Sequence, residues 1–223
     1  GGGVRTINAP KDFPAVRQEK DWVLLIQAVK PSPDEKPEPA PRAQRATRDV
    51  QWVNPSIPAT PGLSHHILAS KVMGHDVGYV IWTPPNYSRD ANARYPVIYF
   101  LHGAGGNESA DSGGFSSWVT RAIADGSLPP VLYVFPNGGM SGYRGEVEKM
   151  ITEELIPTID EDYCTLAQPQ SRALAGFSMG GSGSVYLSIM HPELFCAAGS
   201  MGGGIQGRSE QMAAAIDKAV PMW

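Results

Sequence analysis

Cysteine, clustered basic residues and long apolar runs are all scarce in this sequence. The two cysteines, Cys164 and Cys196, are too few for a disulfide framework. A bridge between them is conceivable, because each should lie near the start of a strand, but we expect buried cysteines that pack as small hydrophobic side chains instead. Apolar runs such as 22–26 and 97–101 are far shorter than the roughly 18 residues of a membrane helix. The sequence therefore predicts no membrane span.

The charge balance excludes further classes of partner. The chain carries 18 Lys and Arg and 22 Asp and Glu residues, a formal net charge of −4, and no basic cluster. This argues against nucleic acid or an anionic membrane as the main partner. The 223 residues are 42% hydrophobic and 18% charged, which excludes disorder and allows one or two domains. A small, neutral substrate is compatible with this composition.

The N-terminal part of the chain differs in composition from the rest. Residues 1–30 show no period apart from an apolar run at 21–29, and we interpret them as an extension or as the remnant of an upstream domain. Five prolines between Pro31 and Pro41 oppose helix and sheet, so residues 31–60 are predicted to form a semi-rigid linker. The chain begins without a methionine, which leaves room for an upstream signal peptide, and a secreted or periplasmic location is favoured over a cytoplasmic one.

Residues 61–223 alternate between strand and helix signals. Two strand-like runs, 64–72 and 77–83, flank a turn and predict an antiparallel hairpin. Further strands are expected at residues 96–102, 131–135, 173–177 and 194–200, and helices at 116–125, 146–159, 179–190 and 209–219. This order predicts an α/β fold with a largely parallel sheet covered on both faces, whose ligand site lies at the carboxyl ends of the strands.

Ser178 is the pivot of the most informative stretch. It lies in Ala175-Gly-Phe-Ser-Met-Gly-Gly181, between a predicted buried strand and a predicted helix. A G-x-S-x-G pattern is weak by itself, but strand, turn and helix in this order are the context of a nucleophile elbow. Such a turn leaves no room for side chains two residues before and after the serine, where this chain has Gly176 and Gly180. We predict that Ser178 is a nucleophile that forms an acyl-enzyme.

A second stretch fits the same site. The predicted strand Tyr95-Pro-Val-Ile-Tyr-Phe-Leu-His-Gly103 opens into a glycine-rich loop that could aim backbone N–H groups at an oxyanion. With the elbow, Pro136-Asn-Gly138 and Glu154-Leu-Ile-Pro-Thr-Ile159 before Tyr163, it resembles the esterase family of the α/β-hydrolases. That family includes feruloyl esterases, acetyl xylan esterases, S-formylglutathione hydrolase and the mycolyltransferases. The resemblance covers the chain from about residue 65 to about residue 204.

The resemblance implies an α/β-hydrolase fold and a serine carboxylic-ester hydrolase that acts on feruloyl or acetyl esters of carbohydrate, without cofactor or metal. It implies an oxyanion hole from the backbone N–H groups of Met179 and Ala104, with Gly105 as the alternative to Ala104. Phe115 and Trp118 could line an acyl or sugar pocket, although core packing is at least as common for such residues. Acyl transfer of the mycolyltransferase type and a non-catalytic binding module on a hydrolase scaffold stay open.

The base of a catalytic triad is harder to place than the nucleophile. In this fold the acid and the histidine follow the serine, and only His191 does so here. A helix that starts at the elbow carries His191 roughly 15 to 20 Å away from Ser178, too far for a base. His102 lies at the correct edge of the sheet, but the resemblance makes it a scaffold residue of the oxyanion loop. In the resembling family the acid and the histidine follow later strands, so we expect them beyond Trp223.

The remaining histidines lie on the predicted hairpin. His65, His66 and His75 lack the acidic or cysteine neighbours and the spacing that a zinc site needs, so we expect surface or packing roles for them. Domain by domain, the sequence therefore predicts an extension at 1–30, a linker at 31–60 and an esterase domain at 61–223 whose C-terminal part is missing.

Overall fold

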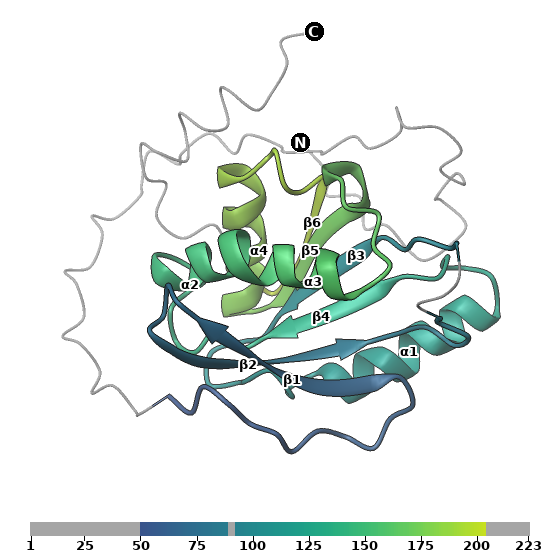
Figure 1. Cartoon of the computed structure of the whole chain (residues 1–223), viewed down its shortest axis with the longest axis horizontal. Coiled ribbons are helices and arrows are strands. Elements are labelled where there is room, and N and C mark those ends of the chain that lie inside the picture. Colours follow the sequence, from purple (N-terminus) through teal and green to yellow (C-terminus); the bar gives the residue numbers. More distant parts are fainter. Residues whose placement is uncertain (1–49, 89–91, 204–223) are drawn as a thin grey trace, which may run out of the picture. The chain divides into compact units, whose positions relative to one another are not determined.

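A mixed sheet organises the residues that the computed structural model describes, 50–88 and 92–203 (Figure 1). Within these ranges the strand order is β1-β2-β4-β3-β5-β6. The strands are β1 (Leu63–Ser70), β2 (His75–Trp82), β3 (Val97–Leu101), β4 (Leu132–Pro136), β5 (Arg172–Phe177) and β6 (Ala197–Met201). The predicted helix at 209–219 and the apolar run at 21–29 lie outside the described residues.

The sheet changes from antiparallel to parallel at β4. β1 and β2 form the predicted hairpin, in which Leu63 pairs with Trp82 and Ser70 with His75, and β2 runs antiparallel to β4. β4, β3, β5 and β6 are mutually parallel. The carboxyl ends of β3, β4, β5 and β6 therefore meet at one edge of the sheet, as the sequence predicted.

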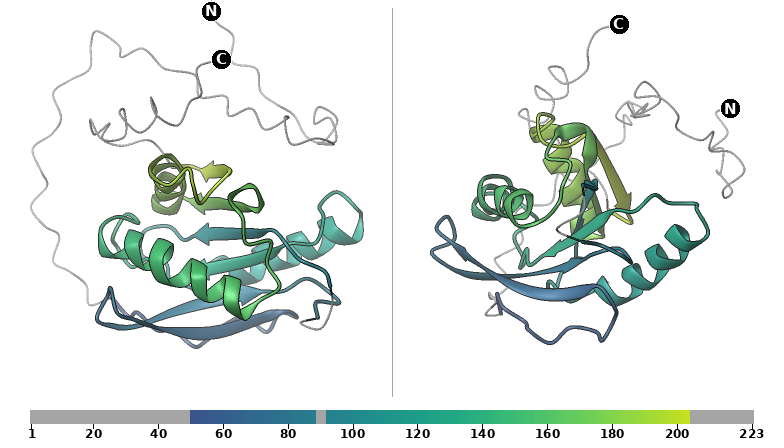
Figure 2. Two further views of the ribbon diagram at one scale, coloured as in Figure 1. Left: turned by 45° about the horizontal axis from the view of Figure 1, so that its top comes forward. Right: turned by 45° about the vertical axis from the view of Figure 1, so that its right-hand side comes forward.

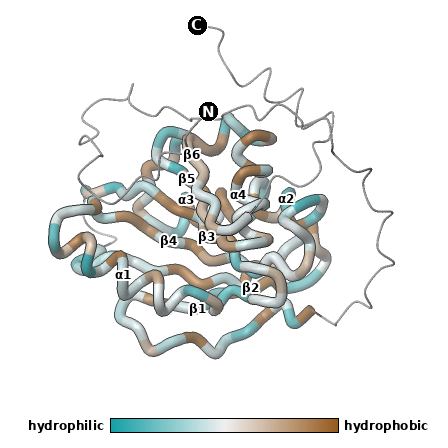
Figure 3. The backbone as a smooth tube through the Cα atoms, turned by 180° about the vertical axis from the view of Figure 1, so that it is seen from behind, coloured by the Kyte–Doolittle hydropathy of each residue, from teal (hydrophilic) through white to brown (hydrophobic). Residues whose placement is uncertain are grey.

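Helices cover both faces of the sheet. The helix α1 (Ser112–Ala124) lies on one face, and α2 (Glu146–Lys149), α3 (Ile156–Asp162) and α4 (Met179–Met190) lie on the other, as the turned views in Figure 2 show. Each face has its own hydrophobic cluster, because successive side chains of a strand point to opposite faces. Tyr99 and Leu101 of β3 belong to the larger cluster and Phe100 to the smaller one. The hydrophobic stretches follow the central strands (Figure 3), and every residue of β4 is buried.

The helical segment before β5 is not the single α-helix predicted for residues 146–159. A π-helical turn, Met150–Leu155, separates α2 from α3. The buried residues of this segment include Val147, Ile151, Leu155 and Ile159, which recur every four residues. Because an α-helix has about 3.6 residues per turn, such a stripe would wind around it, and a wider turn keeps the stripe on the sheet. The repeat predicted burial correctly, but the helix type was wrong.

Residues 50–60 are bonded to the sheet, although they belong to the predicted linker. The carbonyl of Trp52 accepts a hydrogen bond from the Gly78 N–H at 2.7 Å, and Trp52 packs against the larger hydrophobic cluster. The side chain of Asn137 donates to the Gln51 carbonyl at 3.0 Å. Composition alone predicted a semi-rigid linker up to residue 60, but these contacts tie residues 50–60 to the sheet.

Candidate active site

Three segments that leave parallel strands meet at the carboxyl edge of the sheet. Leu101 at the end of β3 pairs with Gly176 of β5, so His102 and Ser178 follow neighbouring strand ends. Tyr99 of β3 pairs with Val134 of β4, so Asn137 follows β4 at the same edge. The topology therefore brings the glycine-rich loop after β3, the Pro-Asn-Gly segment and the predicted nucleophile together.

Ser178 occupies a strained turn between β5 and α4. Its backbone has φ 51° and ψ −112°, a conformation that non-glycine residues rarely adopt. Its N–H donates to the Met201 carbonyl at 2.8 Å, and its carbonyl accepts the Ser182 N–H at 3.0 Å. These bonds to β6 and to the first turn of α4 hold the residue in place. Strain of this kind persists only where the surrounding structure enforces it.

Gly176 and Gly180 lack side chains for a steric reason. A Cβ atom on Gly180 would lie 1.9 Å from the carbonyl oxygen of Leu101, and one on Gly176 would lie 2.3 Å from the carbonyl oxygen of Gly180. Both obstacles are backbone atoms, which cannot rotate away. The glycines on either side of Ser178 therefore allow β5 and α4 to pack directly against the end of β3, as expected for an elbow.

The loop after β3 lies beside Ser178. A Cβ atom on Gly103 would be 3.6 Å from Cβ of Ser178, so the two segments are in contact at this point. Ala104, the predicted oxyanion residue, is exposed in the loop, and so is the alternative Gly105. The N–H of Gly105 donates to the sulfur of Met140 at 3.2 Å. Met179, the other predicted oxyanion residue, opens α4.

His102 serves as a buried part of the loop scaffold. Its side chain is 2% exposed, Nδ1 lies 2.8 Å from the Gly103 carbonyl oxygen, and Nε2 accepts the Gly138 N–H at 3.0 Å. Because a backbone N–H can only donate, Nε2 carries no proton and Nδ1 is the donor. Burial lowers the pKa of His102, partly opposed by the hydrogen bond to Gly103. With both nitrogens occupied, this neutral ring is not placed to take the proton of Ser178.

The other histidines also have partners away from the elbow. His191 at the end of α4 contacts Glu148 at 2.8 Å and Glu193 at 3.3 Å. His65 contacts Glu108, His66 contacts Ser64 and Tyr163, and His75 contacts the Asp76 carbonyl. None of these histidines, all within the described ranges, is part of the elbow. No group of three His, Cys, Asp or Glu side chains in the described residues is arranged to hold a metal ion.

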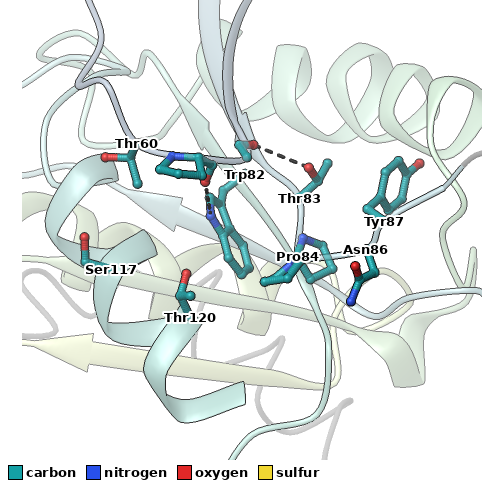
Figure 4. Close-up of a pocket in the computed structure, with 11 residues that line it drawn as sticks. Thr60, Trp82, Thr83, Pro84, Asn86, Tyr87, Ser117 and Thr120 are labelled. Atoms are coloured by element: carbon teal, nitrogen blue, oxygen red, sulfur yellow. Dashed lines mark hydrogen bonds between the residues drawn. The ribbon is translucent and has the colours of Figure 1, made fainter. Parts of the chain in front are cut away.

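Phe115 and Trp118 of α1 are the predicted pocket residues. Phe115 packs on Phe100, with ring centroids 4.2 Å apart, in the smaller hydrophobic cluster. Trp118 is 55% exposed. Neither residue lines the cavity of about 530 Å³ in Figure 4, which lies between the end of β2 and α1. Trp82 in that cavity pairs with Tyr133 near the start of β4, so the cavity is at the edge of the sheet opposite to Ser178.

Sequence reasoning missed three buried residues that surround the loop. Glu108 is 0% exposed, Asn137 is 1% exposed, and the hydroxyl of the buried Tyr143 donates to the His102 carbonyl at 3.0 Å. The sequence shows Pro136-Asn-Gly138 only as a motif shared with the esterase family, and no local pattern distinguishes Glu108 from a surface glutamate.

The two cysteines are not bonded to each other. Cys164 is buried and Cys196 is exposed. No helix in the described part of the chain is long and apolar enough to span a membrane.

A strained serine at a strand-turn-helix elbow, on a mostly parallel sheet, defines the α/β-hydrolase class. Residues 70–223 match the model of the family described as "Putative esterase", and the chain belongs to that family. It is 36% identical over 122 residues to an endo-1,4-beta-xylanase/feruloyl esterase of Xylanibacter ruminicola, an alignment that covers 50% of this chain and 17% of that protein. It is 29% identical over 153 residues to an esterase of Mycobacterium tuberculosis, covering 64% of this chain and 32% of the relative.

Solved structures of esterases share the fold. A ferulic acid esterase superposes with a TM-score of 0.61 at 26% sequence identity, over 70% of this chain and 66% of that one. A ferulic acid esterase from Anaeromyces mucronatus gives a TM-score of 0.56 at 23% identity, over 64% of this chain and 58% of the other. The α/β-hydrolase fold that the sequence predicted is therefore confirmed. The chain spans about a sixth and a third of the length of the two relatives named above.

Proposed function

We propose that the protein is a serine carboxylic-ester hydrolase that acts on acyl groups carried by carbohydrate, with Ser178 as its nucleophile. The observation that carries this proposal is the backbone of Ser178, held at φ 51° between two glycines that have no room for a side chain. A serine held in this way presents its hydroxyl at the top of the sheet, where an ester can approach. The family and the ester-cleaving relatives support the reaction class.

The reaction would proceed in two acyl-transfer steps. The Ser178 Oγ attacks the ester carbonyl carbon, its proton passes to a general base, and the alcohol leaves with that proton. Water then attacks the acyl-enzyme, which releases the acid and restores the serine. We assign none of the described histidines as the base, because none of them is hydrogen-bonded to Ser178 and each has other partners. The N–H groups of Met179 and Ala104 would stabilise the tetrahedral oxyanion.

The substrate class is the finer part of the proposal. One relative is named as a xylanase and feruloyl esterase, and the solved ferulic acid esterases share the fold. A feruloyl or acetyl ester of a plant polysaccharide is therefore the substrate to test first. Phe115 and Trp118 are kept as candidate pocket residues, and Trp118 is the one with an exposed ring.

A non-catalytic binding module is the second candidate. The observation that favours it is that His65, His66, His75, His102 and His191 all have other partners. Labelling by a fluorophosphonate separates the candidates, because the probe reacts with an activated serine and a dead scaffold offers none. Covalent labelling of Ser178 in the full-length gene product, located by mass spectrometry, would exclude the binding module.

The decisive experiment replaces Ser178 by alanine in the full-length gene product. Hydrolysis of ethyl ferulate and p-nitrophenyl acetate should fall by about 10⁴-fold or more, because without the nucleophile only binding and the oxyanion hole remain. The circular dichroism spectrum should not change. Ser188→Ala is the matched control, since Ser188 lies on the same helix and its hydroxyl donates to the Val185 carbonyl. Turnover of Ser178→Ala within tenfold of the parent would refute the assignment.

A further inference from the structure

The loop Gly103–Asn107 is anchored at both ends by buried polar side chains. His102 before it is 2% exposed and Glu108 after it is 0% exposed, whereas Ala104 and Gly105 between them are exposed. Exposed glycine-rich loops are ordinarily variable in conformation, because glycine has little steric restriction. An anchor at each end can hold such a loop in one conformation.

Glu108 accepts hydrogen bonds from three different parts of the chain. Oε2 accepts from Asn137 Nδ2 at 2.8 Å and from Asn54 Nδ2 at 2.9 Å. Oε1 accepts from the Asn54 N–H and from His65 Nε2, the latter at 3.1 Å. A carboxylate offers about four acceptor sites and no donor when ionised, so these bonds fill it. The close approach needs Gly78, where a Cβ atom would lie 2.1 Å from Oε1.

Asn137 connects the Glu108 carboxylate to the loop that follows β4. A carboxylate can only accept, so the NH₂ group of Asn137 must face Glu108. Its Oδ1 then accepts the Gly139 N–H at 3.0 Å, and the N–H of the intervening Gly138 donates to Nε2 of His102 at 3.0 Å. An amide turned by 180° would place N–H against N–H at Gly139. The carboxylate, together with the Gln51 carbonyl that accepts the other N–H of Asn137 at 3.0 Å, therefore holds the amide in the orientation whose Oδ1 bonds to Gly139, next to the Gly138 N–H that donates to His102.

His102 connects Gly138 to the peptide that joins Gly103 and Ala104. Because Nε2 accepts, Nδ1 carries the proton and donates to the Gly103 carbonyl at 2.8 Å. The same carbonyl accepts the Gly106 N–H at 3.0 Å, which closes the turn. In a trans peptide the C=O and the following N–H point in opposite directions. Fixing the Gly103 carbonyl toward His102 thus aims the Ala104 N–H away from that ring.

We propose that Glu108 is a positioning residue, which acts through Asn137 and His102 to aim the Ala104 N–H at the oxyanion. The inference rests on the proposed function, since an oxyanion forms only if Ser178 attacks an ester. Glu108 touches no reacting atom in this scheme. Its contribution is to keep the donor in place before the reaction, which is where the benefit of a preorganised oxyanion hole arises.

The kinetic test compares two variants. One replaces the Glu108 carboxylate itself, and the other removes only one of the groups that donate to it. Glu108→Gln keeps the shape but places an NH₂ group opposite donors, whereas Asn54→Ala removes one donor and leaves the Asn137 bond intact. In the full-length gene product, Glu108→Gln should lower kcat about 10- to 100-fold with KM within about twofold. Asn54→Ala should lose stability without losing kcat. Equal effects of both variants on kcat would overturn the inference.

Two further measurements keep the test decisive. If Glu108→Gln does not fold, Asn137→Ser breaks the next link while Glu108 keeps its bonds to Asn54 and His65, and the same loss of kcat is expected. NMR of ¹⁵N-labelled histidine reads the ring of His102 without substrate. The parent and Asn54→Ala should show a neutral ring protonated on Nδ1, and Glu108→Gln should show a changed ring signal or faster exchange of that proton.

The two arms separate the failure of this inference from the failure of the proposed function. Ser178-dependent turnover in the parent, together with an unchanged His102 signal and kcat in Glu108→Gln, would leave the esterase assignment standing and refute the role of Glu108. Absence of Ser178-dependent turnover in the parent would refute the function, and with it the oxyanion role, whatever the NMR shows.

Discussion

The two edges of the parallel strands bury charged groups in different ways. At the carboxyl edge, Glu108 accepts hydrogen bonds from Asn54, His65 and Asn137, and its network extends to the loop beside the elbow. At the opposite edge, Arg172 at the start of β5 pairs with Asp160 at 2.6 Å and donates to the Leu194 carbonyl at 3.1 Å, while its Nε has no hydrogen-bond partner.

The Glu108 network reaches the loop beside Ser178, whereas the Arg172–Asp160 pair only holds secondary-structure elements together. The Arg172 pair joins β5 to α3 and to the turn before β6, but it contacts no loop at the carboxyl edge. The Glu108 network is continuous through Asn137 and His102 with the loop next to Ser178. Substitutions at both edges should therefore change stability, and only those that break the path from Glu108 through Asn137 and His102 to the loop should also change catalysis.

The largest expected effect is that of Gly180→Ala at the carboxyl edge. The new Cβ would lie 1.9 Å from the Leu101 oxygen and 2.7 Å from the His102 oxygen, so β3 and α4 must separate. Overpacking usually costs about 1–3 kcal/mol, and clashes with backbone should exceed that range. Urea denaturation should show a loss above about 3 kcal/mol or no folded protein. A midpoint equal to that of the parent would mean that the elbow is packed differently.

Arg172→Met should have the next largest effect on stability and little effect on turnover. The variant leaves the carboxylate of Asp160 without its cation, and breaking a buried pair costs about 3 kcal/mol or somewhat more. Denaturation would measure the loss, and kcat at a temperature where the variant is folded should stay within about twofold of the parent. A tenfold drop in kcat would show that the opposite edge also supports the site.

The pH dependence of stability should reveal the neutral ring of His102. Burial lowers its pKa in the folded state, so the unfolded chain binds a proton near the ordinary value of 6.5 before the folded chain does. The contribution of His102 to the free energy of unfolding is therefore complete above about pH 6.5. It decreases as the pH falls toward the folded pKa, by up to about 1.4 kcal/mol per pH unit.

His102→Asn is the control for this titration, because its amide can still donate to the Gly103 carbonyl but cannot be protonated. Denaturation of both proteins between pH 7.5 and 5 should give a steeper loss for the parent. Equal slopes would mean that His102 takes up its proton equally readily in both states.

The smallest expected effect is a gain from Gly114→Ala in α1. A Cβ at this exposed helical position meets no atom within 4 Å. Replacing glycine by alanine in a helix restricts the unfolded chain and should add about 0.4–1 kcal/mol. Thermal unfolding should show a small rise in Tm with unchanged turnover, in contrast to Gly180→Ala. A lower Tm would indicate that α1 is not helical at this position in solution.

Most of the fold was predictable because its signals are local. Apolar runs and turn residues placed β1 to β5 and α4 within a few residues, and the order of strands and helices predicted a parallel sheet. The π-helical turn Met150–Leu155 was not predictable, because apolar residues spaced four apart are also typical of an α-helix. Only the packing against the sheet, which needs these residues to stay on one face, distinguishes the two. The start of α1 at Ser112 also lay earlier than expected.

Among the site residues, those that depend on chain geometry could be read from the sequence. The glycines around Ser178 follow from the close approach of an elbow to its neighbouring strand. The oxyanion residues Ala104 and Met179 stay predictions, as do the pocket roles of Phe115 and Trp118. The domain boundaries at residues 30 and 60 stay predictions too, apart from the bonding of residues 50–60 to the sheet.

The sequence by itself determined which turns need glycine, which apolar runs form strands, and the position of Ser178 between a strand and a helix. Only the tertiary structure decided what Glu108, Asn137 and His102 do. A buried glutamate is stable only when donors saturate it, and here the donors come from residues 54, 65 and 137, which the fold brings together. No local pattern encodes that convergence, because it exists only after the strands have paired.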